Sequence, residues 1–290
     1  MSQKHSKISF NTQTSSFQCS GMFYPKKLTH TNRLPDSKAR MVYNKKTKNG
    51  TTTIIQMNNI LTQQHKDILD VILAKTKRLN DKKFVATITK YEILKQLGYD
   101  NPKNRYAWLN KKLKEIRQTF HEVEFRQSNG QRFIATVQTF TDIVHDDEKY
   151  LFIFDARYIH LFYTLQQSVD YKPLLADIIQ IKDSVIKAVV RYCLMHKYKK
   201  SDLFEILKEV GYEVEDKKGR MARNIKKIFA DNQKTLNRFN IKYDRKRNFI
   251  TYNRKPLEDN GLIRVFKMSE KAMINENKEE TWKYVFKPKN

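Results

Sequence analysis

The sequence GRMARNIKKIFADNQKTLNRFNIKYDRKRNFITYNRK occupies residues 219–255. Its first part predicts an amphipathic helix, because apolar residues recur at three- and four-residue steps: Met221, Ile225, Ile228, Phe229, Leu236 and Phe239. The opposite side carries cations, namely Arg223, Lys227, Lys234 and Arg238. After Phe239, alternating residues on both sides of a DRKRN turn predict a β-hairpin. A basic helix followed by a basic hairpin suits a winged-helix DNA-binding unit, although a solvated lysine face would show the same pattern.

A repeat earlier in the chain bears on these two interpretations. Residues 92–99 are EILKQLGY and residues 205–212 are EILKEVGY, with six of eight positions identical. Helix-capping patterns open the two copies: Thr89 with Glu92, and Asp202 with Glu205. The sequence therefore predicts two copies of one supersecondary unit.

The elements around the repeat extend the agreement. Helices are predicted before each copy, over 62–79 and 183–197, and after each copy, over 105–121 and 220–238. In the first copy a hairpin follows, with HEVEF and RFIATVQTF flanking the turn QSNG over 121–140. Three helices and a hairpin in this order are typical of a winged helix. We predict an α+β fold with two tandem winged-helix domains, each a helix-turn-helix plus a β-hairpin.

We divide the chain into four parts on this basis. The polar N-terminal residues carry ten Lys or Arg and one acid, which favours a flexible basic arm with a short strand at 51–57. An acidic connector at 142–148 precedes an apolar strand at 150–155 and a helix at 156–165. Two strand-like segments near the C-terminus, GLIRVFKM and TWKYVFKPK, are expected to pack on the second domain. The predicted divisions are an arm over 1–53, a first winged-helix domain over 54–166, a second over 167–256 and a tail over 257–290.

Composition limits the class of protein. The 290 residues carry a formal charge of +26, which implies polyanionic partners, nucleic acid first and acidic membrane second. No window approaches the apolar length of a membrane span, and the two cysteines cannot form a zinc site, so we expect a cytoplasmic protein without membrane contact. No GxxxxGK[ST] or HExxH motif occurs, and no histidine pair has metal-ligand spacing. We expect no enzymatic activity, no catalytic residue, no cofactor and no metal.

The two copies differ in the charge of the helix before the hairpin. In the second copy, Arg, Lys and Asn side chains of the types that bond base edges gather near the helix start: Arg220, Arg223, Asn224, Lys226 and Lys227. Lys234 and Arg238 continue this face, and the turn residues Arg245, Lys246 and Arg247 suit phosphate contacts. The first copy has a mixed face with Lys111 and Lys114, and Arg132 on its hairpin. We assign base recognition to the second copy, and backbone or protein contacts to the first.

The motifs ILTQQHKDILDVIL, TITKYEILKQLGY and RYAWLNKKLKEI, followed by a hairpin, resemble the replication initiators of iteron-containing bacterial plasmids, the RepE, π and TrfA-like proteins. The resemblance covers about residues 54–255. It implies that 220–238 would be the helix that binds the origin repeats (iterons), with 244–247 as its wing turn. It also implies dimerisation through the first domain, a monomer–dimer equilibrium, and recruitment of a host initiator and the replicative helicase in the bacterial cytoplasm.

Three functions are compatible with these features. A plasmid replication initiator is the function that we expect. A winged-helix transcriptional repressor, acting on its own promoter, would use the same two domains. A nicking enzyme of mobile DNA is less favoured, because the sequence has no clustered metal ligands near any tyrosine.

Overall fold

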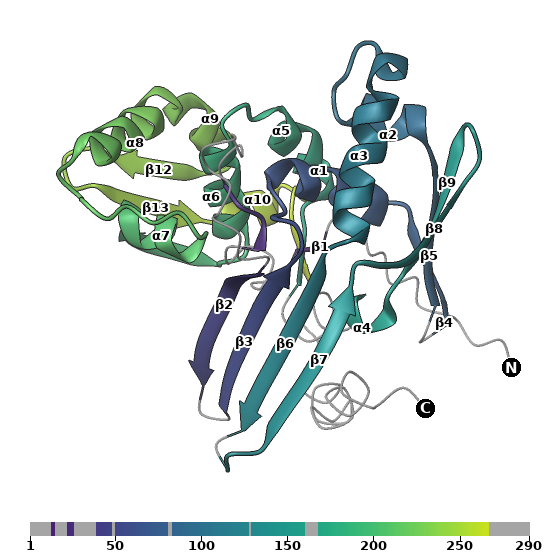
Figure 1. Ribbon diagram of the computed structural model, residues 1–290. Helices are drawn as coiled ribbons and strands as arrows, with labels where there is room; N and C mark the ends of the chain where they lie inside the picture. Colours follow the sequence, from purple (N-terminus) through teal and green to yellow (C-terminus); the bar gives the residue numbers. More distant parts are fainter. Residues whose placement is uncertain are drawn as a thin grey trace, which may run out of the picture.

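The computed structural model describes residues 13–14, 22–25, 39–47, 50–80, 83–127, 129–159 and 168–266 (Figure 1). It is a mixed α+β fold with several antiparallel sheets, which confirms the predicted fold class at this level. Within the described residues, no helix has the length and apolar character that a bilayer crossing requires.

In the first unit, the helix predicted over 62–79 begins after the N-cap Thr62 but ends at Leu73, because Thr76–Asn80 forms a strand that pairs with the next strand. The second helix of the unit begins at the predicted capping box, because Thr89 Oγ1 accepts the Glu92 N–H while Glu92 Oε2 accepts the Thr89 N–H. A one-turn 3₁₀ helix at Pro102–Arg105 precedes the third helix. The unit consists of α1 (Gln63–Leu73), β4 (Thr76–Asn80), β5 (Lys83–Thr89), α2 (Lys90–Gln96), α3 (Tyr106–Arg117), β8 (Phe140–His145) and β9 (Lys149–Phe154).

The second unit repeats this order with two differences: it has no described strand equivalent to β4, and it has one more short helix before its hairpin. Asp202 caps the second helix by accepting the Phe204 N–H, whereas Glu205 bonds to Ser201 instead of closing a capping box. The unit consists of α6 (Ser184–Leu194), β11 (Tyr198–Asp202), α7 (Leu203–Glu209), α8 (Arg220–Asp231), α9 (Gln233–Arg238), β12 (Ile241–Asp244) and β13 (Phe249–Asn253).

Strand pairing relates the two units more closely than the short identical motif does. The sheet orders are β4-β5-β9-β8 and β11-β13-β12, so in both units the strand before the second helix pairs with the last strand. The first N–H of that helix also has an equivalent partner in the two units, namely the carbonyl oxygen of the residue just before the last strand. Lys90 N–H donates to Glu148 O, and Leu203 N–H donates to Asn248 O, both at 2.9 Å. The two units therefore share one topology, as the repeat predicts.

The hairpin predicted at 121–140 forms, but it belongs to another sheet. Its strands are β6 (Phe120–Gln127) and β7 (Arg132–Gln138), with Arg126 opposite Arg132. They continue a four-stranded sheet of order β2-β3-β6-β7, which extends away from α3 in Figure 1. The strands that complete the first unit are β8 and β9, so the predicted acidic connector at 142–148 is the end of β8 and the turn that joins β8 to β9.

The basic arm predicted over 1–53 needs a correction. Residues 39–47 and 50–53 are not a flexible arm, since β2 (Ala39–Thr47) and β3 (Gly50–Met57) are strands of that four-stranded sheet. The physical reason is pairing with β6, which runs in register from Gly50 opposite Gln127 to Met57 opposite Phe120. Met22 and Phe23, which also belong to the predicted arm, are fully buried in the hydrophobic core.

The segments that join and follow the two units form a small sheet. The connector holds α4 (Ala156–Ile159), β10 (Ser168–Asp170), the 3₁₀ turn Lys172–Leu174 and α5 (Leu175–Gln180). After the second unit come α10 (Lys255–Asp259) and β14 (Arg264–Phe266). The sheet order is β1-β10-β14, where β1 is Gln13–Thr14, so the first predicted tail strand pairs with the connector. The rest of the predicted helix at 156–165 and the second predicted tail strand lie outside the described residues.

One hydrophobic core spans both units. The helices α1 and α6 meet at its centre, and every residue of α6 from Val185 to Leu194 is buried (Figure 1). Each apolar side chain buried there contributes about 1.5–3 kcal/mol relative to exposure. The equivalent first helices of the two units are thus packed against each other rather than separated by a free linker.

Candidate nucleic-acid interface

The helix α8 presents the most cationic surface of the second unit. Its inward face is buried at Ala222, Ile225 and Phe229, which are the positions that a 3.6-residue period directs to the core. Met221, predicted for that face, is 38% exposed, because it lies at the edge of the stripe. The outward side chains are exposed: Arg220, Arg223, Asn224 and Lys227. Half-buried Lys226 lies over the Phe204 ring, with its Nζ 5.4 Å from the ring centre.

The start of α8 depends on a glycine. Gly219 is the N-cap residue, and a Cβ at this position would lie 2.5 Å from Asp216 Oδ2. Asp216 is itself held in place, because its Oδ1 accepts the Lys218 N–H at 2.8 Å. The close approach of this carboxylate explains why a residue without a side chain stands where the basic helix begins.

The helix predicted over 220–238 is interrupted at Asn232, whose side chain donates to the Ile228 carbonyl oxygen at 2.9 Å. The short helix α9 therefore takes a new direction. Lys234 on α9 is exposed. Arg238 forms an ion pair with Asp177 of α5, so this predicted DNA contact is tied to the connector helix.

The β12–β13 turn adds a second group of cations. Arg245, Lys246 and Arg247 are all exposed. Asp244 orders the turn by accepting the N–H groups of Lys246 and Arg247 at 2.9 and 3.1 Å. Within the described part of the chain, no carboxylate lies within ion-pair distance of Arg220, Arg223, Lys227, Lys234, Arg245 or Lys246. These charges remain available to an external polyanion.

The first unit has a different electrostatic character. Lys111 and Lys114 are exposed on α3, but the equivalent turn, between β8 and β9, is anionic. Asp146, Asp147 and Glu148 are exposed there. Lys90 Nζ fastens this turn by donating to the carbonyl oxygens of Asp146 and Asp147 at 3.1 and 2.9 Å. An anionic turn repels a phosphate backbone, so of these two elements α3 is the one suited to approach it.

A hollow of about 820 Å³ lies between α3 and β8. Amide, cationic and aromatic side chains line it, among them Asn58, Asn110, Lys114, Arg117, Gln118 and Tyr150. Tyr150 donates a hydrogen bond to Asn110, and Arg117 forms an exposed ion pair with Asp142 at 3.1 Å. Sequence reasoning missed this hollow because its walls come from segments far apart in the chain, and no local pattern marks them.

Arg132 does not join the other predicted contacts. It lies on β7, where it donates to Glu124 of β6 at 2.8 Å, and its strand belongs to the sheet that extends away from α3 (Figure 1). The structure therefore gathers the predicted cations of the second unit on α8, α9 and the β12–β13 turn. In the first unit it brings together Lys111 and Lys114 alone.

Comparison with known proteins gives a likeness of structure only. No protein-family model matches the chain. No curated protein sequence matches it. A crystal structure of domains 2 and 3 of RctB, in selenomethionine form, matches with a TM-score of 0.50 at 12% identity, over 76% of this chain and 85% of that one. A second crystal structure of RctB domains 2–3 has a TM-score of 0.48 at 12% identity, over 78% and 86%. At this identity the chain shares a fold with RctB domains 2 and 3.

Proposed function

We propose that this chain is a DNA-binding replication initiator whose two units act as tandem winged helices on repeated origin sequences. The observation that carries the proposal is the exposed cationic surface of α8 and the β12–β13 turn, on a unit of helices and a three-stranded sheet of order β11-β13-β12. RctB is a replication initiator of a Vibrio chromosome origin, and the shared fold supports the same role here. The motifs that resemble iteron-binding initiators favour a plasmid origin.

The proposed mechanism divides recognition between the two units. The N-terminal half of α8 enters the major groove, where Arg220, Arg223 and Asn224 can bond guanine and adenine edges. The cations of the β12–β13 turn contact phosphates beside that groove. The first unit adds phosphate contacts from Lys111 and Lys114 on α3, while its acidic turn stays away from the backbone. Base specificity would then come mainly from the second unit.

No covalent step is part of the proposal. Binding energy is spent on deforming the DNA beside the repeats, and an AT-rich segment opens because its deformation costs least. The resemblance to plasmid initiators adds self-association and the recruitment of a host initiator and a replicative helicase.

Footprinting of the purified chain on DNA that flanks its own gene tests the proposal. An initiator should protect several direct repeats at regular spacing beside an AT-rich segment. Protection of one inverted repeat alone would instead indicate a repressor. Incubation of the same DNA, supercoiled, with Mg²⁺ or Mn²⁺ completes the test, since a covalent tyrosyl–DNA adduct would show a nicking enzyme and overturn the proposal.

A further inference from the structure

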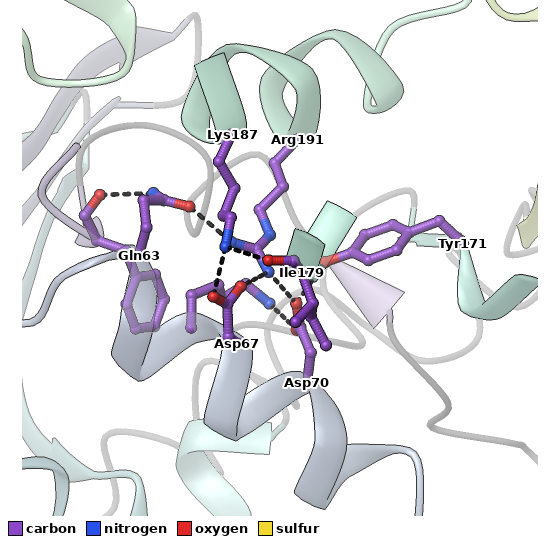
Figure 2. A network of polar contacts seen from close by, with 9 residues as sticks. Gln63, Asp67, Asp70, Tyr171, Ile179, Lys187 and Arg191 are labelled. Atoms are coloured by element: carbon purple, nitrogen blue, oxygen red, sulfur yellow. Dashed lines mark hydrogen bonds and ion pairs between the residues drawn. The ribbon is translucent and has the colours of Figure 1, made fainter. Parts of the chain in front are cut away.

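A buried polar network joins the two units at the contact between α1 and α6 (Figure 2). Arg191 of α6 donates to three side chains of α1, with Gln63 Oε1 and Asp67 Oδ1 at 2.7 Å and Asp70 Oδ2 at 2.8 Å. Lys187, one turn earlier on α6, donates to Asp67 Oδ2 at 2.6 Å and to the Ile179 carbonyl oxygen at 3.0 Å. Arg191 and Asp67 are 124 residues apart in the sequence, so the network joins distant parts of the chain.

The network also holds the connector between the units. Tyr171 donates to Asp70 Oδ2 at 2.9 Å, and Lys66 pairs with the other oxygen of the same carboxylate. All of the charged members are less than 9% exposed. Burial opposes the charge on Arg191, yet the carboxylates of Asp67 and Asp70 hold the pKa of Arg191 above its usual value. The guanidinium is therefore charged in this network.

Directional bonds at this place have a consequence that apolar packing would not have. An apolar contact between helices admits several ridge-and-groove arrangements. A buried guanidinium has all of its N–H groups hydrogen-bonded only when it lies within reach of every acceptor. If the helices shifted, the guanidinium and the carboxylates would remain buried without partners. Since buried ion pairs give little net stability over apolar residues of the same shape, their effect here is to select one arrangement of α1 against α6.

That arrangement sets the relation between the two basic helices. Within the first unit α1 is tied to α3, because His65 Nε2 donates to Glu115 Oε2 at 2.7 Å. Within the second unit, α6 packs in the same core as Ala222, Ile225 and Phe229 of α8. A shift of α6 along α1 would carry α8 and its turn with it. The distance between the DNA contacts of the two units therefore depends on the network.

We propose that Gln63, Asp67, Asp70, Lys187 and Arg191 are positioning residues that fix the separation of the two duplex segments that one chain contacts. The inference rests on the proposed function, because it takes α3 and α8 as the DNA-contacting helices. It extends that function by making the spacing of the contacts, and not only their base sequence, a determinant of binding. These residues touch no DNA themselves.

A distance measurement tests the first half of this inference without DNA. Spin labels at Gln96→Cys and Glu209→Cys, with Cys19→Ser, report on the two units from equivalent exposed ends of α2 and α7. Arg191→Lys keeps the charge but loses the fork. Asp67→Leu with Lys187→Met removes the Lys187–Asp67 pair and one acceptor of Arg191, whose charge keeps Asp70 as its partner. Both variants should broaden or shift the electron-electron distance distribution. A distribution as narrow as that of the labelled parent, at the same mean distance, would overturn the inference.

The matched control is Arg254→Lys. Arg254 is also a buried arginine, 3% exposed, and it donates to Glu258 Oε1 at 2.7 Å. Its partners belong to the second unit and to α10, which follows it, and none belongs to the first unit within the described residues. This variant should leave the distance distribution unchanged. A broadening equal to that of Arg191→Lys would mean that any buried arginine change loosens the chain, and would contradict a specific role for the network.

A series of DNA sites tests the second half. Insertion of about five base pairs, half a helical turn, between the two protected segments rotates one contact to the far side of the duplex. The parent should lose about tenfold or more in affinity, whereas Arg191→Lys and the double variant should lose less than about threefold. Equal losses in parent and variants would overturn the inference. If the parent binds no sequence specifically, the proposed function fails, and the distance measurement decides separately whether the network fixes the two units.

Discussion

Asp146 and Asp244 each stand at the start of the turn that closes the hairpin of their unit. Each accepts the backbone N–H groups two and three residues further on: those of Glu148 and Lys149 at 2.8 and 2.6 Å, and those of Lys246 and Arg247 at 2.9 and 3.1 Å. The same side-chain contact therefore orders two turns of different length, 146–148 and 245–248, and the turns carry opposite charge, since acids follow Asp146 and cations follow Asp244. Because the aspartate contact uses only backbone N–H groups, it does not depend on the charge of the side chains that follow.

Removal of the turn cations should weaken binding to all DNA sequences alike. Replacing Arg245 and Lys246 with Ala removes two phosphate contacts, so the slope of log affinity against log salt should become shallower by about 0.9 for each. Fluorescence anisotropy over a salt series measures that slope. Lys208→Ala, which removes an exposed cation from α7, is the control and should leave the slope unchanged. A change in base preference in the turn variant would contradict a purely phosphate-binding role.

Substitutions on the two basic helices should have different effects. Arg223→Ala and Lys227→Ala, on α8, should each cost about 1–3 kcal/mol of discrimination against the wrong base. Lys111→Ala and Lys114→Ala, on α3, should weaken binding to specific and unrelated sequences by similar factors. Competition assays with specific and scrambled duplexes separate the two outcomes. If the α3 changes altered base preference and the α8 changes did not, the assigned roles would be reversed.

Local periodicity predicted those parts of the interface that lie on one element. The apolar stripe of α8 recurs every three or four residues, so the sequence itself shows which side chains point outward. The turn cations after Asp244 follow directly from the hairpin signal. Strand partners could not be predicted in this way, because β6 pairs with β3 across more than sixty residues and no local feature of TTTIIQM indicates it. The acids at 146–148 predict a connector and not a turn for the same reason, since a charged turn and a charged linker have similar composition.

The junction of the two units was beyond such reasoning. Lys187 and Arg191 interrupt an apolar helix, and cations on a helix are usually solvated, so nothing local predicts their burial. Their partners Asp67 and Asp70 likewise look like the polar face of α1. These charged residues are buried because α1 packs against α6, and that contact joins helices more than a hundred residues apart in the sequence.

Neutralisation of Glu115 should destabilise the first unit. Burial acts to raise the pKa of Glu115, but the hydrogen bonds from His65 and Lys112, both at 2.7 Å, lower it to about 2. A carboxyl with a lowered pKa in the folded state contributes stability above pH 4.5 that is lost as the pH falls towards 2. Glu115→Gln should therefore lower the free energy of unfolding at pH 7 by on the order of 2 kcal/mol. Urea unfolding measures this difference.

The control for that variant is Glu209→Gln, at an exposed position of α7, which should change the unfolding free energy by less than about 0.5 kcal/mol. A second check uses pH. The difference between the parent and Glu115→Gln should shrink at pH 3, where the carboxyl of the unfolded chain is protonated. A difference that stays constant from pH 7 to pH 3 would show that the carboxylate charge is not its cause.

Acidification should destabilise the fold through His121. Gln56 Oε1 accepts the Leu61 N–H, so the amide nitrogen of Gln56 faces His121 Nε2 at 3.3 Å and donates to it. A proton at Nε2 would place two donors face to face. Burial accordingly lowers the pKa of His121 from 6.5 to about 4. Between these values the unfolded chain binds more protons than the folded one, so the free energy of unfolding should fall as the pH drops from about 6.5 to about 4, by on the order of 3 kcal/mol.

His121→Gln should show a smaller fall in the free energy of unfolding. His65, whose pKa burial also lowers, should supply the remainder. Urea unfolding at pH 7.5 and pH 4.5 gives both values, with His145→Gln at an exposed position as the control. An undiminished fall in His121→Gln would assign the acid sensitivity to other groups.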